Sequence, residues 1–316
     1  MEKIPVKHWP FEPADFVPFK DREVCERLRK ISGADLEKHP NPDFRIKVML
    51  NPHPVLIGRL FTLIKESDDL DKKCTLILGN PEPDTYLPLA ELINYHKVSC
   101  RNVNIFAMDE WADQDGRIAP ETYEAGFAHS MLKYLVYAID GELRMPLKNV
   151  YYPTNKNITS YSKMITDIGE GGADLCSSSP GWTGHLAFID PVDEFIKPTI
   201  EEYLHQEARI IKLHPLTIAQ NSLHGVFGMS GNIAAVPPMA ATIGPVDVLN
   251  ARERIEVHAL QTNGTYSSWQ RMTSRLVLHG PVTPLVPSSI LQLMKTQVYV
   301  SLSLAAPFGC DELAGY

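Results

Sequence analysis

Short apolar runs alternate along most of the chain with longer segments in which apolar residues recur every three or four positions. The short runs predict buried strands at residues 46–50, 74–78, 103–108, 173–176, 208–213, 232–236, 255–260 and 297–304. The longer segments predict helices at residues 21–33, 54–67, 85–97 and 123–138. Strands that alternate with helices form a parallel sheet covered on both faces, so the pattern predicts an α/β fold.

The N-terminal part of the chain differs from the rest. Residues 9–19 are rich in proline and aromatic side chains, and one predicted helix and a loop over residues 36–45 follow them. No internal repeat or low-complexity linker divides the remainder. We therefore expect an N-terminal extension over residues 1–45 and a single domain over residues 46–316.

Charge and composition exclude several classes of partner. The formal net charge of −8 argues against nucleic acids and anionic membranes, which need a basic face. No run approaches the roughly 18 apolar residues of a membrane span, and the first residues lack the apolar core of a signal peptide. The five cysteines form no C-x-x-C pair, which disfavours a structural zinc site and favours a reducing, cytoplasmic location.

Three loops that carry polar or glycine residues follow directly on predicted strands. They cover residues 79–83, 109–113 and 181–190. In parallel α/β sheets the ligand lies beyond the carboxyl ends of the strands. The shared position of the three loops therefore predicts one ligand site.

The chemistry of two of these loops suggests proton transfer. His185 closes a Gly-x-x-Gly-His turn, and Asp190 follows five residues later. Asp109 and Glu110 form a second acidic pair at the end of another apolar run. A histidine with a carboxylate partner is a common unit of acid–base catalysis, so we expect an enzyme that acts on a small polar molecule. A structural histidine, and carboxylates that only cap the following segment, are the alternatives.

Three segments resemble one known family, in the same order. Residues 106–111 (FAMDEW) with 120–123 (PETY), residues 181–191 (GWTGHLAFIDP), and residues 236–251 with their VP, ATIG and DVLNA elements carry the resemblance. They are similar to the glucosamine-6-phosphate deaminases and their sugar-phosphate isomerase and 6-phosphogluconolactonase relatives. The resemblance extends over about residues 74–305.

The resemblance implies a Rossmann-like, three-layer α/β/α fold with a mostly parallel sheet, and isomerisation of an amino sugar with loss of ammonia. By this resemblance Asp109 is the base that moves a proton between C2 and C1, and His185 opens the sugar ring. Asp190 orients His185 and stabilises its charge, and Glu110 lines the same strand end. The family implies no metal, no organic cofactor and a homo-oligomer. The implied partner is a small sugar or sugar phosphate. The residues expected to bind it are Gly79, Asn80, Thr183, Gly184, Trp182 and Arg209. Of these, Trp182 either stacks on a sugar face or packs within the fold, and Arg209 is a candidate for the phosphate.

The chain departs from the family at the residues that bind phosphate and assist ring opening. Thr183 stands where the family has a second aspartate, and a hydroxyl carries no charge near neutral pH. Pro81 removes one amide donor from the phosphate loop, and Leu223 stands at a family arginine. The family's later lysine has no counterpart near residues 261–265. Candidates to replace these contacts are Arg209, Lys212 and Arg271.

These departures leave three functions open. The first is an amino-sugar isomerase or deaminase with altered substrate specificity, and the other two are a sugar-sensing protein without catalysis and a lactonase. No helix-turn-helix is visible in residues 1–45, which argues against a DNA-binding sensor. The intact acidic segment at 108–111 and the Asp190-Pro191 ending of the histidine segment are closer to the deaminases than to the lactonases.

Overall fold

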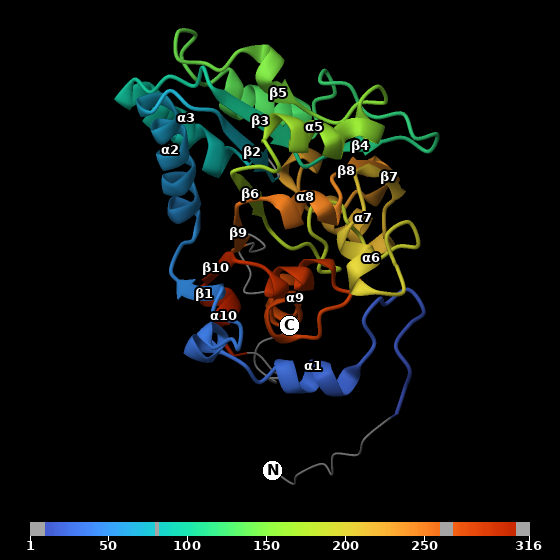
Figure 1. The fold of residues 1–316 in the computed structure, drawn as a ribbon. Helices are drawn as coiled ribbons and strands as arrows, with labels where there is room; N and C mark the ends of the chain where they lie inside the picture. Colours follow the sequence, from blue (N-terminus) through green and yellow to red (C-terminus); the bar gives the residue numbers. More distant parts are fainter. Residues whose placement is uncertain (1–9, 80–81, 260–267, 308–316) are drawn as a thin grey trace.

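The computed structural model describes residues 10–79, 82–259 and 268–307, and a parallel sheet runs through the middle of the molecule (Figure 1). Seven strands pair in the order β1-β10-β9-β6-β2-β3-β5, and every neighbouring pair is parallel. The strands are β1 (Phe44–Met49), β2 (Cys74–Leu78), β3 (Val103–Ala107), β5 (Val150–Tyr151), β6 (Leu175–Ser178), β9 (Glu253–His258) and β10 (Thr296–Ser301). The α/β class and the parallel sheet are as predicted.

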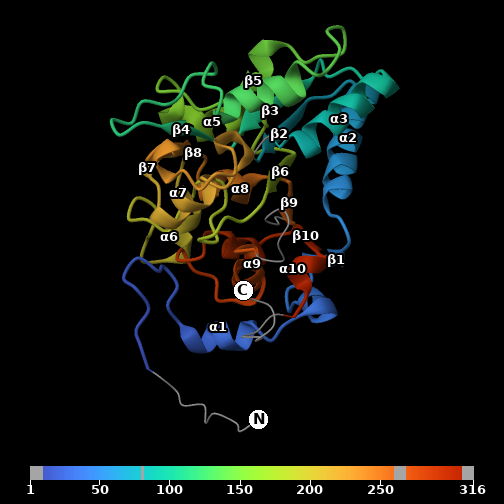
Figure 2. The ribbon, with the colours of Figure 1, turned by 180° about the vertical axis from the view of Figure 1, so that it is seen from behind.

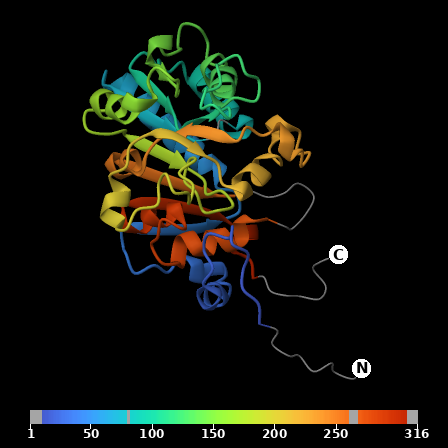
Figure 3. The same cartoon turned by 90° about the vertical axis from the view of Figure 1, so that its right-hand side faces the viewer.

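Helices cover both faces of this sheet, which makes three layers. Figures 1 and 2 show α2 and α3 on one side of the strands, and α5, α8 and α9 on the other. In Figure 3 the strands lie one above another through the middle of the molecule. The helices are α1 (Arg22–Leu28), α2 (His53–Asp69), α3 (Pro83–His96), α4 (Phe127–Met131), α5 (Tyr161–Ile168), α6 (Ile200–Leu204), α7 (Pro215–Asn221), α8 (Pro245–Asn250), α9 (Gln270–His279) and α10 (Leu302–Ala305).

The central strands are apolar on both faces because each face packs against helices. All five residues of β2 and all five of β3 are buried. Side chains alternate between the faces along a strand. Leu76 and Leu78 therefore join the core on the α2 and α3 side, while Ile77 joins the core on the α5 and α9 side. Continuous apolar runs of this kind are expected for parallel strands buried on both faces.

A second, antiparallel sheet stands beside the carboxyl ends of the main sheet. It contains β4 (Asp109–Ala112), β8 (Met239–Thr242) and β7 (Arg209–Lys212), in the order β4-β8-β7. The predicted loop over residues 109–113 is therefore mostly strand. The chain leaves β3, passes Met108 and enters β4 at once, which places Asp109 where the two sheets meet.

One predicted strand in this region is wrong, and one predicted helix elsewhere is shorter than expected. Residues 232–236 form a 3₁₀ turn (Ile233–Ala235), and the strand lies a few residues later at β8. Pro237 and Pro238 lack amide hydrogens and cannot continue a ladder, whereas β8 pairs with a strand on each side. The predicted helix over residues 123–138 begins only at Phe127 and continues as a π-helical turn (Leu132–Val136).

The N-terminal segment packs against the end of the chain. Leu28 and Leu36 are buried, and α1 lies beside α9 (Figure 1). The Arg275 guanidinium in α9 donates to the carbonyls of Ile31 and Leu304, which joins the two ends of the chain. β1 begins at Phe44, inside the extension predicted to end at residue 45. The division into an extension and a single domain stays a prediction.

The remaining predicted elements are found with small shifts of their ends. The predicted helix over residues 21–33 ends at Leu28, and a 3₁₀ turn (Gly33–Glu37) follows it within the predicted loop. The last residue of the predicted strand 255–260 lies outside the described residues. Of the helices described, none combines the length and the apolar character that a membrane span requires.

Candidate active site

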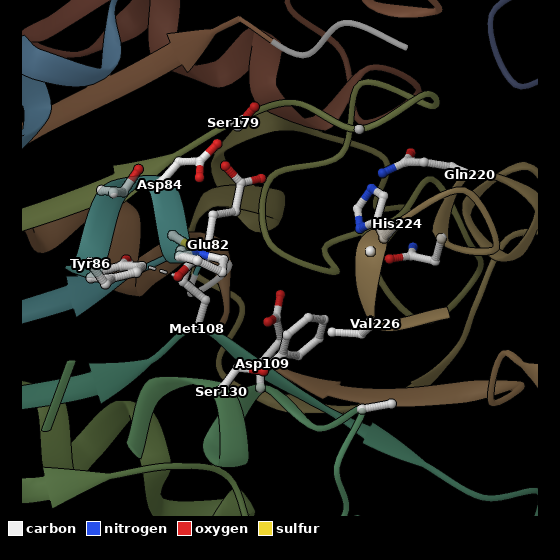
Figure 4. A pocket seen from close by; sticks show the side chains of 18 of the residues that line it. Glu82, Asp84, Tyr86, Met108, Asp109, Ser130, Ser179, Gln220, His224 and Val226 are labelled. Carbon is white, nitrogen blue, oxygen red and sulfur yellow. Dashed lines mark hydrogen bonds between the residues drawn. The ribbon is translucent and has the colours of Figure 1, made fainter. Parts of the chain in front are cut away.

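One large cleft lies beyond the carboxyl ends of the central strands, at the position predicted for a ligand. Its volume is about 1570 Å³. The four adjacent strands β9, β6, β2 and β3 each bring residues to its wall, among them Val257, Ser178, Gly79 and Asp109. Figure 4 shows side chains from these strands and from the segment after α7 that face a common space. Two of the three predicted loops thus meet here with the beginning of β4.

Asp109 is buried and points into this cleft (Figure 4). Among the described residues, no hydrogen-bond donor reaches its carboxylate. Burial raises the pKa of Asp109 well above its usual range, and the neighbouring charge of Glu110 raises it further. A carboxylate with a raised pKa takes up a proton more readily, which suits a general base near neutral pH.

Glu110 does not face the cleft. Its carboxylate accepts hydrogen bonds from the backbone N–H groups of Trp111, Phe127 and Ala128, at 2.8, 3.2 and 2.8 Å. These groups belong to β4 and to the start of α4, so Glu110 holds the helix to the strand. Burial raises the pKa of Glu110 to about 7 although these hydrogen bonds oppose the shift. The structure places Glu110 in a capping role and not at the strand end where we expected it to line the site.

His185 lines the opposite part of the cleft, and its Nδ1 atom is surrounded by oxygen atoms. Asp190 Oδ1, Thr183 Oγ1 and Thr217 Oγ1 each lie 3.1 Å from it. Both hydroxyls also donate to Asp190 Oδ1 at 2.8 Å, so both accept from His185 when Nδ1 carries its proton. This arrangement favours the tautomer with the proton on Nδ1 and leaves Nε2 free to exchange a proton with a ligand.

Asp190 remains ionised in this network. Burial by itself would raise its pKa, but the charge and hydrogen bond of His185, and hydrogen bonds from the His214 amide and the Thr217 hydroxyl, outweigh burial and lower it. A permanent carboxylate beside Nδ1 stabilises a protonated imidazole. Asp190 therefore has the position predicted for it, as the partner that orients His185.

Gly181 brings the backbone directly against the imidazole. A Cβ atom at this residue would lie 2.0 Å from His185 Nε2, which no side chain tolerates. The glycine therefore sets how closely the turn approaches the ring. Gly184 has a φ of +77° and would place a Cβ atom 2.7 Å from Val286, so it shapes the same turn.

Of the other residues predicted to bind substrate, some line the cleft and others do not. Gly79 lines the cleft, and Asn80 and Pro81 lie outside the described residues. Thr183, Gly184 and Trp182 do not line it: the Thr183 hydroxyl contacts Asp190, and Trp182 stacks on Trp269 with ring centres 5.9 Å apart.

None of the three cations predicted to replace the phosphate contacts lines the cleft. Arg209 donates to the Glu194 carbonyl and lies over the Phe195 ring. The backbone N–H of Lys212 donates to the Glu194 carboxylate, and Arg271 donates to the Ala306 carbonyl.

Sequence reasoning missed several residues of the site. Glu82, Asp84 and Tyr86 enter the cleft from the start of α3, and Gln220 and His224 face them from the far side in Figure 4. Burial, followed by the charge of His185, lowers the pKa of His224 to about 4, so this imidazole is neutral at physiological pH. Position alone could have suggested the first three, because α3 follows β2 directly.

The described residues include no cluster of three or more histidine, cysteine, aspartate or glutamate side chains suited to a metal ion. The arrangement instead brings a buried carboxylate and an oriented imidazole to one cleft. Together they can remove a proton at one position of a ligand and move a proton at another.

Comparisons with known proteins agree with the resemblance seen in the sequence. No family model matches the chain. It is 27% identical to the glucosamine-6-phosphate deaminase of Lachnoclostridium phytofermentans over 224 residues, which cover 69% of this chain and 81% of that protein. It is 25% identical to the deaminase of Pseudoalteromonas translucida over 228 residues, which cover 71% and 75%.

Solved structures share the fold at lower identity. A monomeric glucosamine-6-phosphate deaminase matches with a TM-score of 0.66 and 17% identity, over 82% of this chain and 98% of that one. The 6-phosphogluconolactonase of Trypanosoma cruzi matches with a TM-score of 0.58 and 14% identity, over 86% and 100%. These matches confirm the predicted three-layer α/β fold.

Proposed function

We propose that this chain, as a divergent member of the glucosamine-6-phosphate deaminase and 6-phosphogluconolactonase superfamily, isomerises and deaminates an amino sugar. The observation that carries the proposal is the pairing of Asp109 with His185 in one cleft. Among the described residues, the buried Asp109 carboxylate has no hydrogen-bond partner, and His185 is hydrogen-bonded through Nδ1 and not through Nε2. The reaction needs a base at C2 and a group that moves a proton at the ring oxygen of the same sugar.

The proposed chemistry divides the work between the two groups. His185 moves a proton to the ring oxygen through Nε2, which opens the sugar, while Asp190 stabilises the imidazolium. Asp109 then takes the proton from C2 and returns it to C1. Water replaces the amine at C2, so the aldose and water become a ketose and ammonia. Thr183 gives the network a hydroxyl where the family has a carboxylate, so Asp190 alone carries the negative charge beside the ring.

A sensing role without catalysis and a lactonase activity are the competing proposals. An eroded catalytic site would not need a buried and unpartnered Asp109, since burying a carboxylate without compensation is costly. A lactonase would use His185 to activate water and would have no need for a base at C2. The sensing role therefore predicts no turnover, and the lactonase activity predicts turnover that does not need Asp109.

The test is ammonia release from glucosamine and from glucosamine 6-phosphate, with Asp109→Asn beside the wild-type protein. We expect turnover of at least one sugar, and a loss of about 10²–10⁴-fold in the variant because the base is gone. Thermal unfolding of both proteins checks that the fold is retained. No ammonia from either sugar, or equal rates in the variant, would contradict the proposal, and hydrolysis of a sugar lactone would then favour the lactonase.

A further inference from the structure

The cleft is lined by more carboxyl groups than lysine or arginine side chains. Among its described lining residues, four carry carboxylates and a single lysine carries an amine. The carboxylates are those of Glu82, Asp84, Asp109 and Glu124. Four histidines, His53, His129, His185 and His224, also line the cleft. Burial lowers the pKa of His53, and it lowers the pKa of His224 to about 4. A site built for a phosphate ester would need the opposite balance, because a phosphate carries close to two negative charges.

The negative charge gathers where the family resemblance places the phosphate. Glu82 and Asp84 stand at the start of α3, next to the loop that begins at Gly79 (Figure 4). Among the described residues, neither carboxyl group has a hydrogen-bond or ion-pair partner. Burial, followed by the charge of Asp84, raises the pKa of Glu82 to about 7, and a cationic ligand beside Glu82 would favour its ionised form. Pro83, the first residue of the helix, offers no amide hydrogen to an anion.

Glu82 and Asp109 act on the same part of the cleft. The Tyr86 side chain lies close to both, since burial first, and then the charges of Glu82 and Asp109, raise the pKa of its hydroxyl. The hydroxyl donates to the Gly79 carbonyl at 3.1 Å. The acidic end of the cleft therefore adjoins the buried base and belongs to the same ligand site.

Cations that could balance a phosphate are absent from the described walls apart from Lys133. Leu223, at the position of a family arginine, lines the cleft with an apolar side chain. Lys133 is exposed on the π-helical turn after α4, with its Nζ 5.0 Å from the Tyr134 ring centre. Of the four segments outside the described part, residues 80–81, 260–267 and 308–316 contain no lysine or arginine, and residues 1–9 contain Lys3 and Lys7.

We propose that the end of the cleft formed by Glu82 and Asp84 binds a cationic group, so that the substrate is an amino sugar with an ammonium group there and no phosphate. This inference rests on the proposed function for the orientation of the sugar, with its reacting carbons at Asp109. Opposite charges a few ångströms apart attract in a partly buried cleft, and like charges repel by a similar amount. The volume of about 1570 Å³ exceeds the roughly 300–1,000 Å³ of most small-molecule sites and leaves room for the added group.

The test compares three ligands that differ only at C6. They are 1,5-anhydro derivatives of glucosamine with a hydroxyl, an ammonium or a phosphate at this carbon, and none of them can open its ring or react. Calorimetric titration at low salt and near-neutral pH should give the order ammonium, hydroxyl, phosphate, with about tenfold in Kd at each step. The double variant Glu82→Gln/Asp84→Asn should remove most of the difference in Kd between the three ligands. Glu91→Gln, on the exposed side of the same helix and outside the cleft, should leave it unchanged.

Tightest binding of the phosphate derivative by the wild-type protein would overturn the inference. Its loss in Lys133→Met would then identify Lys133 as the phosphate contact. An order that the double variant does not change would overturn the role of Glu82 and Asp84. Because the three ligands do not react, their order is independent of turnover. Failure of the ammonia assay with the order intact would therefore count against the proposed function alone.

Discussion

At the scale of single residues, the site depends on how the two nitrogen atoms of His185 are placed. Three oxygen atoms lie around Nδ1, the backbone at Gly181 passes close to Nε2, and the Phe188 ring packs edge-on against the imidazole. The motif around His185 and Asp190 is local in sequence, so their pairing could be predicted from spacing. The contribution of Thr217 could not, because this residue is 32 positions from His185 and reaches it only through the packing of α7.

Gly181→Ala tests whether the close approach matters. The added Cβ atom cannot coexist with Nε2 at 2.0 Å, so the ring must shift by about 1 Å or more. A displacement of this size costs about 100-fold in kcat/KM. Steady-state kinetics of the variant should show this loss. Gly58→Ala is the matched control, since its Cβ atom meets nothing within 4 Å, and it should keep full activity. Unchanged kinetics in Gly181→Ala would show that Nε2 takes no part in the reaction.

At the scale of elements, β4 explains why two adjacent carboxylates have different roles. Neighbouring residues of a strand point to opposite faces, so Asp109 faces the cleft while Glu110 turns toward α4. The sequence predicted a loop at 109–113, and a loop gives no reason to separate the two side chains. The strand could not be predicted because its partner, β8, begins more than 120 residues further along the chain.

Glu110→Gln tests the capping role through the pH dependence of stability. Burial raises the pKa of Glu110 from 4.5 to about 7 in the folded protein. Its stabilising contribution is therefore full below about pH 4.5 and is lost as the pH rises through about 7. The free energy of unfolding of the wild-type protein, relative to the variant, should fall by about 1–3 kcal/mol between these limits.

Denaturant titrations over a pH series measure this difference. The exposed Glu142→Gln is the control, and its profile should run parallel to that of the wild-type protein. Parallel profiles for Glu110→Gln as well would mean that Glu110 is not buried against α4. Asp109 also changes in the variant, because the charge of Glu110 contributes to its raised pKa, and this acts in the same direction.

At the scale of the whole molecule, the two ends of the chain close the fold together. β1 from the N-terminal part and β10 from the C-terminal part pair along six residues. The alternation of strands and helices predicted the α/β class because each strand or helix can be recognised from the pattern of its own residues. It could not predict that residues 22–37 pack on α9, since that contact depends on side chains more than 200 positions apart.

Arg275→Met tests this closure. The guanidinium is fully buried and donates to the carbonyls of Ile31, Leu304 and Ala306. Its removal takes a donor from the buried Leu304 carbonyl and from the partly buried Ile31 carbonyl, while Ala306 keeps a donor in Arg271, and the free energy of unfolding should fall by about 3–5 kcal/mol. Thermal and denaturant unfolding measure the change. Arg117→Met removes an exposed arginine with surface ion pairs only, and it should cost less than about 1 kcal/mol. Equal effects of the two variants would show that Arg275 does not join the chain ends.

Proton transfer by Asp109 at C2 is the central claim, and solvent deuterium reports it most directly. Amino sugars, with and without phosphate, are incubated with the protein in D₂O, and the products are examined by NMR. We predict deuterium at C1 of the ketose formed by the wild-type protein, and no incorporation by Asp109→Asn. Product without deuterium would mean that the proton moves from C2 to C1 without exchange with solvent. A sugar deuterated at C2 would then give a ketose with deuterium at C1. Incorporation that persists in Asp109→Asn would contradict the account.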